Sequence, residues 1–357
     1  METKRTLRFA ILAVAALGLI ALACTGDDEG DGGGNLLQTV IDRDALRCGV
    51  NDAVPGFGFL QPDGSFAGFD VDFCRAIAAA VFGDASKVEY VPLTAAARFE
   101  ALSAGEIDVL IRNTTWTASR DGELGSAFTI TTFYDGQGMM VRADSGIQTL
   151  ADMANSTICV LQGTTTELNL EDRFTSGGIS YTPLTFEDNE TLEQAFSQDR
   201  CDGWTSDKSQ LASRRSAYPA EAGGPDSLTI LPETFSKEPL GPATRDGDSD
   251  WFDVVNWVVI GMITADELGV TSQNVAAMAA NPPNPDVARL LGVAVGDSPA
   301  TNFGLGIDAD FMQTVLAEVG NYDEVYQRNL APIGLSREGT LNALWRDGGV
   351  MYAPPMR

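Results

Sequence analysis

The chain has 357 residues, of which 50 are acidic and 23 are basic, and it contains no histidine. Its formal net charge of −27 repels nucleic acid and anionic lipid headgroups, so neither is an expected partner of the folded part. The lack of histidine excludes Ser-His and Cys-His nucleophilic sites and His-based zinc sites. A chain of this length exceeds what one hydrophobic core usually organises, so two lobes are expected.

The N-terminus has the pattern of a secretory leader. Basic side chains precede an uncharged apolar run over residues 9–23. This run is shorter than the roughly 20 residues that a membrane-spanning helix needs, and it fits the h-region of a signal peptide. It ends in Ala-Leu-Ala before Cys24, which resembles the lipobox of bacterial lipoproteins. We therefore predict a signal peptide over residues 1–23 and a lipid anchor on Cys24. The alternative is a plain secretory signal cut nearby, with Cys24 incidental.

Glycine and acidic residues dominate the segment that follows Cys24. Such residues cannot bury a core, so we predict a lipidated flexible tether over residues 24–35. A tether makes sense when a folded body must reach something else near the membrane. The expected location is the extracytoplasmic side of the cell envelope, periplasmic or at the cell surface, with the lipid anchor as the only contact with the membrane.

Strands and helices alternate in the first half of the body. The pattern predicts a strand at 46–50, a helix at 69–82, a strand at 87–92, a helix at 95–103 and a strand at 107–111. This βαβαβ order with short connections favours an α/β fold with a mainly parallel sheet.

A second run with the same alternation follows. The pattern predicts strands at 156–161, 180–186 and 201–205, with helices at 164–175 and 189–197. Extended segments at 136–142 and 229–237 could cross between the two halves. We therefore predict a first lobe at 36–138, a second lobe at 139–233, and a return to the first lobe with a C-terminal helical extension at 234–357. Two lobes joined by two crossings form a hinged clamp with the ligand in the cleft.

Four cysteines remain after Cys24, and an oxidising compartment favours disulfides between them. We predict Cys48–Cys74 and Cys159–Cys201, because both members of each pair fall in one lobe and a bridge between the lobes would lock the hinge. Four buried free thiols are the alternative. No CxxC pair is present, and neither a metal nor a cofactor is expected.

Three places could bind a zwitterion. The loop at 112–120 follows a predicted strand at the carboxyl edge of the sheet, where ligands of such sheets bind, and Arg120 could meet a carboxylate with its planar fork. Asp207 holds the equivalent position in the second half and could pair an ammonium. The turn at Thr164 offers free backbone N–H groups to an anion. The alternatives are a surface helix residue for Arg120, an N-cap for Asp207, and a capping box of Thr164 with Glu167.

At these residues the sequence resembles the polar amino-acid-binding proteins of ABC transporters, and most closely their general L-amino-acid-binding subgroup. The similar stretches run from about Asp42 to the C-terminus. They include GFDVDFCRAIAAAVFGDASKVEYVPL, EIDVLIRNTTWTASRD, YDGQGMMVR, QGTTTELNL, RCDGWTSDKSQLA, SKEPLGPATRDGDSDWFDVVNWV, ELGVTSQNV, GNYDEVYQRN and LNALWRDGGVMYAPPMR.

The resemblance implies the two-lobed, type II periplasmic-binding-protein fold, with two crossover segments and a ligand cleft between the lobes. In that family, the Arg that ends the loop after the third strand grips the ligand carboxylate, and Arg120 stands there. The family's acidic partner of the α-ammonium corresponds to Asp207. Neutral hydrogen bonds to the ligand are expected from Asn113, Thr115, Thr164 and Thr165.

In the loop after the first strand, narrow-specificity relatives often carry an acidic residue and a Tyr, whereas residues 51–57 read NDAVPGF and do not hold that pair in the usual register. A pocket tuned to one cationic side chain is therefore not expected. Phe57, Trp116 and Tyr134 could instead line a permissive pocket, or they could pack in the core.

We therefore expect a monomeric solute-binding lipoprotein that captures L-amino acids, with broad specificity, and delivers them to the permease of an ABC importer. It has no GxxxxGK[ST] run and should not hydrolyse ATP. One alternative is an amino-acid-sensing lipoprotein. The other is a cyclic-acid dehydratase on the same fold, which would need a Glu or Asp as its general acid or base.

Overall fold

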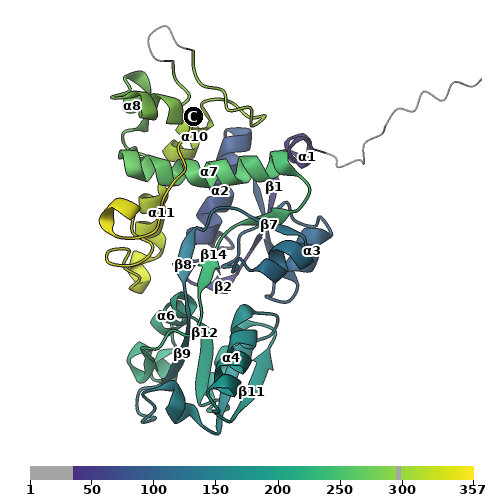
Figure 1. The fold of residues 1–357 in the computed structure, drawn as a ribbon, viewed down its shortest axis with the longest axis vertical. Coiled ribbons are helices and arrows are strands. Elements are labelled where there is room, and N and C mark those ends of the chain that lie inside the picture. Colours follow the sequence, from purple (N-terminus) through teal and green to yellow (C-terminus); the bar gives the residue numbers. More distant parts are fainter. Residues whose placement is uncertain (1–34, 295–298) are drawn as a thin grey trace, which may run out of the picture. The chain divides into compact units, whose positions relative to one another are not determined.

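The computed structural model describes residues 35–294 and 299–357 (Figure 1). The predicted signal peptide, Cys24 and the tether up to residue 34 lie outside this part of the chain. Across the described ranges, no helix combines the length and the hydropathy that a membrane span requires.

The first sheet has five strands in the order β5-β1-β6-β15-β7. Its core is parallel, because β1 pairs in parallel with both β5 and β6, whereas β15 runs antiparallel to β6 and β7. The strands are β1 (Leu46–Val50), β5 (Val88–Pro92), β6 (Val109–Leu110), β7 (Ser126–Phe128) and β15 (Ala243–Arg245). We call the part of the protein that surrounds this sheet the first lobe. It also holds a small antiparallel sheet of β2 (Ala53–Val54), β3 (Gly58–Leu60) and β4 (Phe66–Ala67).

The helices of the first lobe bury one large core. α2 (Phe69–Phe82) packs against α7 (Ser249–Leu268) and α10 (Phe311–Glu318), as Figure 1 shows. α2 is as predicted, and glycines follow both it and α7 in the left-handed conformation that ends helices. The remaining helices are α1 (Leu36–Arg43), α3 (Arg98–Ser103), α8 (Val275–Ala280), α9 (Pro285–Leu290) and α11 (Tyr322–Asn329).

The second sheet has the order β11-β10-β12-β9-β13, and we call its surroundings the second lobe. Its strands are β9 (Gln137–Arg142), β10 (Ser156–Leu161), β11 (Tyr181–Phe186), β12 (Gly203–Asp207) and β13 (Leu228–Ile230). Its helices are α4 (Thr165–Ser176), α5 (Asn189–Ser197) and α6 (Lys208–Ser216). Two α/β lobes, each with its own sheet, confirm the predicted fold class.

The chain passes between the lobes through a two-stranded ribbon. β8 (Phe133–Asp135) pairs antiparallel with β14 (Glu238–Leu240), so that Asp135 faces Glu238. The predicted crossing at 136–142 is wrong as to its position, because these apolar residues form β9, a buried strand of the second sheet. The crossing strand precedes them.

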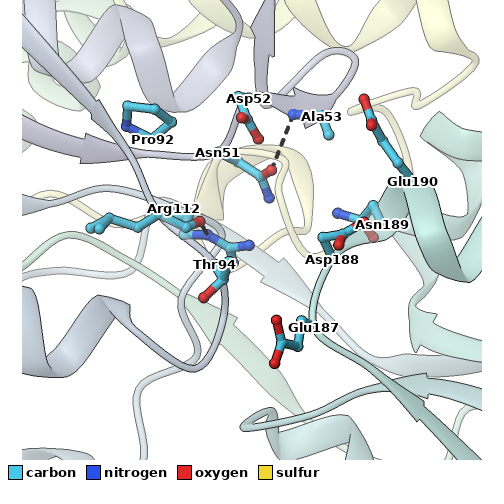
Figure 2. Close-up of a pocket in the computed structure, with 11 residues that line it drawn as sticks. Asn51, Asp52, Ala53, Pro92, Thr94, Arg112, Glu187, Asp188, Asn189 and Glu190 are labelled. Carbon is cyan, nitrogen blue, oxygen red and sulfur yellow. Dashed lines mark hydrogen bonds between the residues drawn. The ribbon is translucent and has the colours of Figure 1, made fainter.

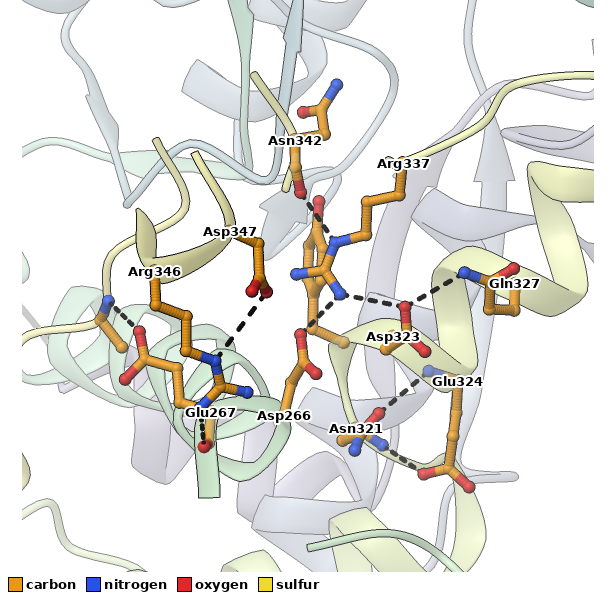
Figure 3. A network of polar contacts seen from close by, with 12 residues as sticks. Asp266, Glu267, Asn321, Asp323, Glu324, Gln327, Arg337, Asn342, Arg346 and Asp347 are labelled. Carbon is orange, nitrogen blue, oxygen red and sulfur yellow. Dashed lines mark hydrogen bonds and ion pairs between the residues drawn. The ribbon is translucent and has the colours of Figure 1, made fainter. Parts of the chain in front are cut away.

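The C-terminal segment is fastened by Arg337 (Figure 3). This buried guanidinium pairs with Asp266 of α7 at 2.6 Å and Asp323 of α11 at 3.0 Å, and lies over the ring of Tyr322. Its Nε donates to the carbonyl of Asn342 at 2.8 Å. The Asn342 side chain then bonds the backbone of Tyr134 in β8, accepting at 2.7 Å and donating at 3.0 Å. The segment therefore contacts both the helical core and the crossing ribbon.

Both predicted disulfides are present. Cys48 joins Cys74 with their Cα atoms 6.1 Å apart, linking β1 to α2 within the first lobe. Cys159 joins Cys201 with their Cα atoms 5.7 Å apart, within the second lobe. Neither bridge connects the two lobes, so the pairing leaves the hinge free.

Replacing Cys159 and Cys201 together with Ala is expected to lower the free energy of unfolding by about 4 kcal/mol, since the bridge closes a loop with a separation of 42 residues. Urea denaturation of the wild type and the double variant measures the difference. The variant keeps the Cys48–Cys74 bridge, so reductant should destabilise it further. An unchanged free energy of unfolding would contradict the prediction.

Candidate functional site

A small cavity of about 20 Å³ lies where the carboxyl ends of the strands of both lobes meet. From the first lobe it is lined by Ala95, Arg98, Arg112, Asn113 and Thr115. From the second lobe it is lined by Leu161, Thr164, Thr165, Thr166, Ser206, Asp207 and Gln210. We call it the inner cavity. A volume of this size admits about one water molecule, so a larger ligand enters only when its walls move apart.

Asp207 presents an unpartnered carboxylate to the inner cavity. It stands at the end of β12 and before α6, yet its side chain makes no cap hydrogen bond, and its buried Oδ1 has no hydrogen-bond partner. Asp207 therefore occupies the N-cap position of α6, as in the predicted alternative, but its side chain does not act as the cap. Burial raises the pKa of Asp207 well above its usual range, and the nearby carboxylates of Asp135 and Glu238 raise it further. A cationic partner would relieve both effects.

Three buried guanidinium groups surround this carboxylate. Arg98 is the first residue of α3, and its Nε has no hydrogen-bond partner. Arg112 donates from Nε to the carbonyl of Leu93 at 2.7 Å. Burial lowers the pKa of Arg98 well below its usual range and that of Arg112 to about 10, as expected when cations leave water. Both line the inner cavity, so it can receive an anion as well as a cation.

Arg120 lies behind the cavity wall. Its Nη1 donates to the carbonyl of Thr115 at 2.7 Å, and its guanidinium lies 5.0 Å from the ring centre of Phe99. It is buried, which lowers its pKa to about 10, so the alternative of a surface residue does not hold. Arg120 does not line the cavity itself, and its pairing with a ligand carboxylate stays a prediction.

Glu238 accepts hydrogen bonds from the hydroxyl groups of Thr115 and Thr165, which were predicted to bind the ligand. Its carboxylate accepts from Thr115 Oγ1 of the first lobe at 2.6 Å and from Thr165 Oγ1 of the second at 2.8 Å. Asn169 and Ser236 also donate to it. Because the threonine hydroxyl hydrogens are directed to Glu238, what these residues can still offer an anion is their backbone N–H groups.

The N-terminus of α4 supplies such groups. Thr164 is the N-cap and accepts from the N–H of Glu167 at 3.1 Å, whereas the Glu167 carboxylate accepts from the N–H of Gly163 at 2.9 Å, so only the Thr164 half of the predicted capping box is present. The N–H groups of Thr165 and Thr166, in the first turn, have no partner within the helix. These N–H groups and the helix dipole favour a negative charge at this edge of the inner cavity.

Four carboxamide side chains cross from lobe to lobe beside the inner cavity, and we call them the amide relay. Asn51 donates to Asn113 at 3.1 Å, Asn113 donates to Gln210 at 3.0 Å, and Gln210 donates to Asn189 at 2.9 Å. Asn113 has a positive φ of 34°, and its backbone N–H donates to the buried Asp70 at 2.6 Å. All four amides are buried, so the relay is an internal hydrogen-bonded link between the two lobes.

A larger cavity of about 260 Å³ adjoins the relay, and we call it the outer cavity (Figure 2). The two ends of the relay, Asn51 and Asn189, line it, as does Arg112, which also lines the inner cavity. Its other walls are Asp52, Ala53, Pro92, Leu93 and Thr94 from the first lobe, and Glu187, Asp188 and Glu190 from the second.

The three predicted aromatic residues line neither cavity. Phe57 is buried in the core, with its ring edge-on to that of Phe133 at 5.4 Å. Trp116 is partly exposed and donates from its indole to Asp121 at 2.6 Å. Tyr134 belongs to the crossing ribbon. Phe57 therefore takes the alternative of core packing, whereas a contact of Trp116 or Tyr134 with a ligand stays a prediction.

Sequence reasoning missed several residues that the structure brings to the site. Arg98, Gln210 and Glu238 were not singled out, although Arg112 stood in the chosen loop. A signal existed for Arg98, since it begins the helix that follows β5 and so lies at the carboxyl edge of the sheet. The signal for Gln210 was its place in the first turn of the helix after Asp207.

Comparison with known proteins agrees with this geometry. The model of the family described as bacterial extracellular solute-binding proteins, family 3, matches residues 46–274. The general L-amino acid-binding periplasmic protein AapJ of Rhizobium johnstonii is 45% identical, over 97% of this chain and 96% of that protein. The glutamate/glutamine/aspartate/asparagine-binding protein BztA of Rhodobacter capsulatus is 44% identical, over 96% of this chain and 99% of that protein.

A solved structure extends the likeness to three dimensions. It is a periplasmic binding protein of an ABC transporter from Brucella ovis, with glutathione bound. It is 42% identical and superimposes with a TM-score of 0.85, covering 91% of this chain and 100% of that one.

Proposed function

Because the chain belongs to the bacterial extracellular solute-binding proteins of family 3, we propose that it captures L-amino acids outside the cytoplasm and delivers them to an ABC importer. The observation that carries this proposal is that one cavity is lined by the buried, unpartnered carboxylate of Asp207 and by the guanidinium of Arg98, whose Nε is unpaired, with Arg120 bonded to Thr115 of the same wall. A zwitterionic headgroup satisfies both charges, which neither a simple anion nor a simple cation can do. As a family of binding proteins, these chains are not enzymes.

Within the headgroup site, Asp207 receives the α-ammonium. Arg120 holds the α-carboxylate, supported by Asn113, Thr115, Thr164 and Thr165. The bond from Arg120 to the Thr115 carbonyl supports this arrangement, because it joins the guanidinium to the loop that lines the cavity. Broad specificity fits the names of the two relatives above, each of which binds more than one amino acid.

The chain works as a monomer at the end of a membrane tether. Residues 1–23 are the signal peptide, and Cys24 carries the lipid anchor at the start of the tether over 24–35. The first lobe then spans 36–136 and 234–357, with the C-terminal extension, and the second lobe spans 137–233, the predicted boundary after 138 being moved because β9 begins at Gln137. Closure of the lobes over a ligand presents a surface that the permease recognises.

A thermal-shift screen tests the proposal. The L-amino acids should raise the melting temperature, because a ligand that binds only the folded state stabilises it by RT ln(1 + [L]/Kd). An amino acid methyl ester, which lacks the carboxylate, and the matching deaminated acid, which lacks the ammonium, are the controls and should give no shift. The proposal fails if no L-amino acid shifts the melting temperature, or if the controls shift it as much.

A further inference from the structure

Most of the space beside the headgroup site lies beyond the amide relay. The inner cavity measures about 20 Å³ and the outer cavity about 260 Å³, and Arg112 borders both. Asn113 and Gln210 line the inner cavity, whereas Asn51 and Asn189 line the outer one. The relay is therefore the wall between the two spaces. A side chain that leaves a headgroup in the inner cavity must meet this wall.

The wall consists of carboxamide groups, and a ligand amide can take the place of one of their hydrogen bonds without leaving any of these groups unpaired. Each link of the relay is a carboxamide N–H donated to a carboxamide oxygen, at 2.9 to 3.1 Å. A ligand amide inserted between Asn113 and Gln210 accepts from the first and donates to the second, so neither buried amide is left unpaired. An apolar side chain inserted there would leave both unpaired, at a cost of about 1–3 kcal/mol for each group.

The outer cavity has buried hydrogen-bond donors that can contact the substituent on the ligand amide. Asn189 is buried and accepts through its oxygen from Gln210, while its own N–H₂ group makes no hydrogen bond within the described chain. Arg112 is also buried, and its one hydrogen bond there uses Nε, so its two terminal nitrogens remain available. These buried donors are on the wall of a cavity that is large enough for several heavy atoms.

The charged residues on the wall of the outer cavity determine which chemical group can stand at the end of the ligand's side chain. Asp52, Glu187 and Glu190 line it with exposed carboxylates, and Asp188 adds a fourth that caps α5. Arg112 is the only basic residue on its wall. A terminal carboxylate on the ligand would meet this excess of negative charge, whereas a neutral or cationic end would not.

We propose that the relay and the outer cavity form an extension subsite for γ-glutamyl amides, that is, for amino acids whose side chain carries a substituted amide with a neutral or cationic end. The amide takes the place of the Asn113–Gln210 link, and its substituent occupies the outer cavity. The subsite rests on the proposed function, because the headgroup remains in the inner cavity.

Calorimetry with matched ligands tests the subsite. N5-ethyl-L-glutamine, whose ethyl group is on the side-chain amide nitrogen and which is called N-ethyl-L-glutamine below, should bind within about tenfold of L-glutamine, because its ethyl group enters the outer cavity. γ-Glutamylglycine, which has the same amide but a terminal carboxylate, should bind at least tenfold more weakly than N-ethyl-L-glutamine. Failure of N-ethyl-L-glutamine to bind, with L-glutamine binding intact, would overturn the subsite alone. Equal affinity for γ-glutamylglycine would overturn its charge selection. If L-glutamine and L-alanine both fail to bind, the proposed function fails with it.

A variant of Gln210 distinguishes a relay that binds the ligand's side chain from a relay that only holds the two lobes together. Gln210→Leu keeps the approximate volume but removes the amide, and Gln148→Leu, at an exposed position of the second lobe, is the matched control. Gln210→Leu should weaken L-glutamine and N-ethyl-L-glutamine by at least tenfold more than L-alanine, whose side chain does not reach the relay. An equal loss for all three ligands would assign the relay to lobe closure only and overturn the subsite.

Discussion

Asp207→Asn is expected to weaken the binding of every amino acid by roughly 30-fold to several thousand-fold. Removing one partner of a buried charge pair typically costs about 2–5 kcal/mol, which corresponds to that range of affinity. The Asp207 carboxylate is buried and has an unpartnered oxygen, so it is free to pair with the α-ammonium, and its loss would leave that charge without this partner. Because the ammonium is common to all amino acids, the factor should be similar across the panel.

The pH dependence of binding gives an independent measure of this role. Burial, together with Asp135 and Glu238, raises the pKa of Asp207, while Arg98 and Arg120 oppose the shift. Only the ionised carboxylate can pair with an ammonium, so affinity should fall as the pH is lowered through that raised pKa. The Asn variant cannot ionise and should lose the acid limb that Asp207 contributes.

Calorimetry on dissimilar amino acids decides the matter. Asp226→Asn is the matched control, since Asp226 is an exposed carboxylate of the same lobe, and it should leave affinity unchanged. A loss at Asp207 that varied widely from one amino acid to another would contradict its assignment to the common headgroup.

Arg120→Ala should also weaken the whole panel, by a factor of similar size. The guanidinium is buried and donates to the Thr115 carbonyl, so its removal takes away both the charge that we propose pairs with the α-carboxylate and an anchor of the loop. The rough cost is again about 2–5 kcal/mol, because the ligand carboxylate would be desolvated without its partner. Titration calorimetry over the same panel measures it.

Two further variants make this test decisive. Arg173→Ala removes an exposed guanidinium from the last turn of α4 and should have no effect. Arg98→Gln removes the guanidinium that borders the inner cavity. If Arg120→Ala spares most of the panel while Arg98→Gln abolishes binding, then Arg98 is the partner of the α-carboxylate and the assignment of Arg120 is wrong.

The sequence predicts local structure well because the signals are local. Alternating apolar runs located β1, α2 and both βαβ units, and the distribution of cysteines over the two lobes led to both disulfides. The boundaries shift where packing overrides pattern. The helix expected from residue 95, for example, begins only at Arg98, and the segment after residue 136 joins the second sheet.

The site was harder to predict because its parts are distant in sequence. The relay joins Asn51 to Asn113 and then Asn113 to Gln210, and no local pattern marks a carboxamide as one link of such a chain. Glu238 likewise receives hydrogen bonds from Thr115 and Thr165, which belong to different lobes. Phe57 shows why the sequence left two alternatives open, since an aromatic residue near a binding loop can line a pocket or complete the core, and here it completes the core.

The C-terminal segment also determines where the molecule can bend. The Asn342 side chain bonds both the N–H and the carbonyl of Tyr134, so β8 is attached to the C-terminal segment. Arg337 in turn attaches this segment, the tail, to α7 and α11. On this crossing strand, the chain that leads on to β9 is thus held to the first lobe as far as Tyr134, and only Asp135 and Gly136 lie between that attachment and β9. The tail is therefore part of the first lobe's side of the hinge, so that a shortened tail would alter the crossing strand without touching the ligand site.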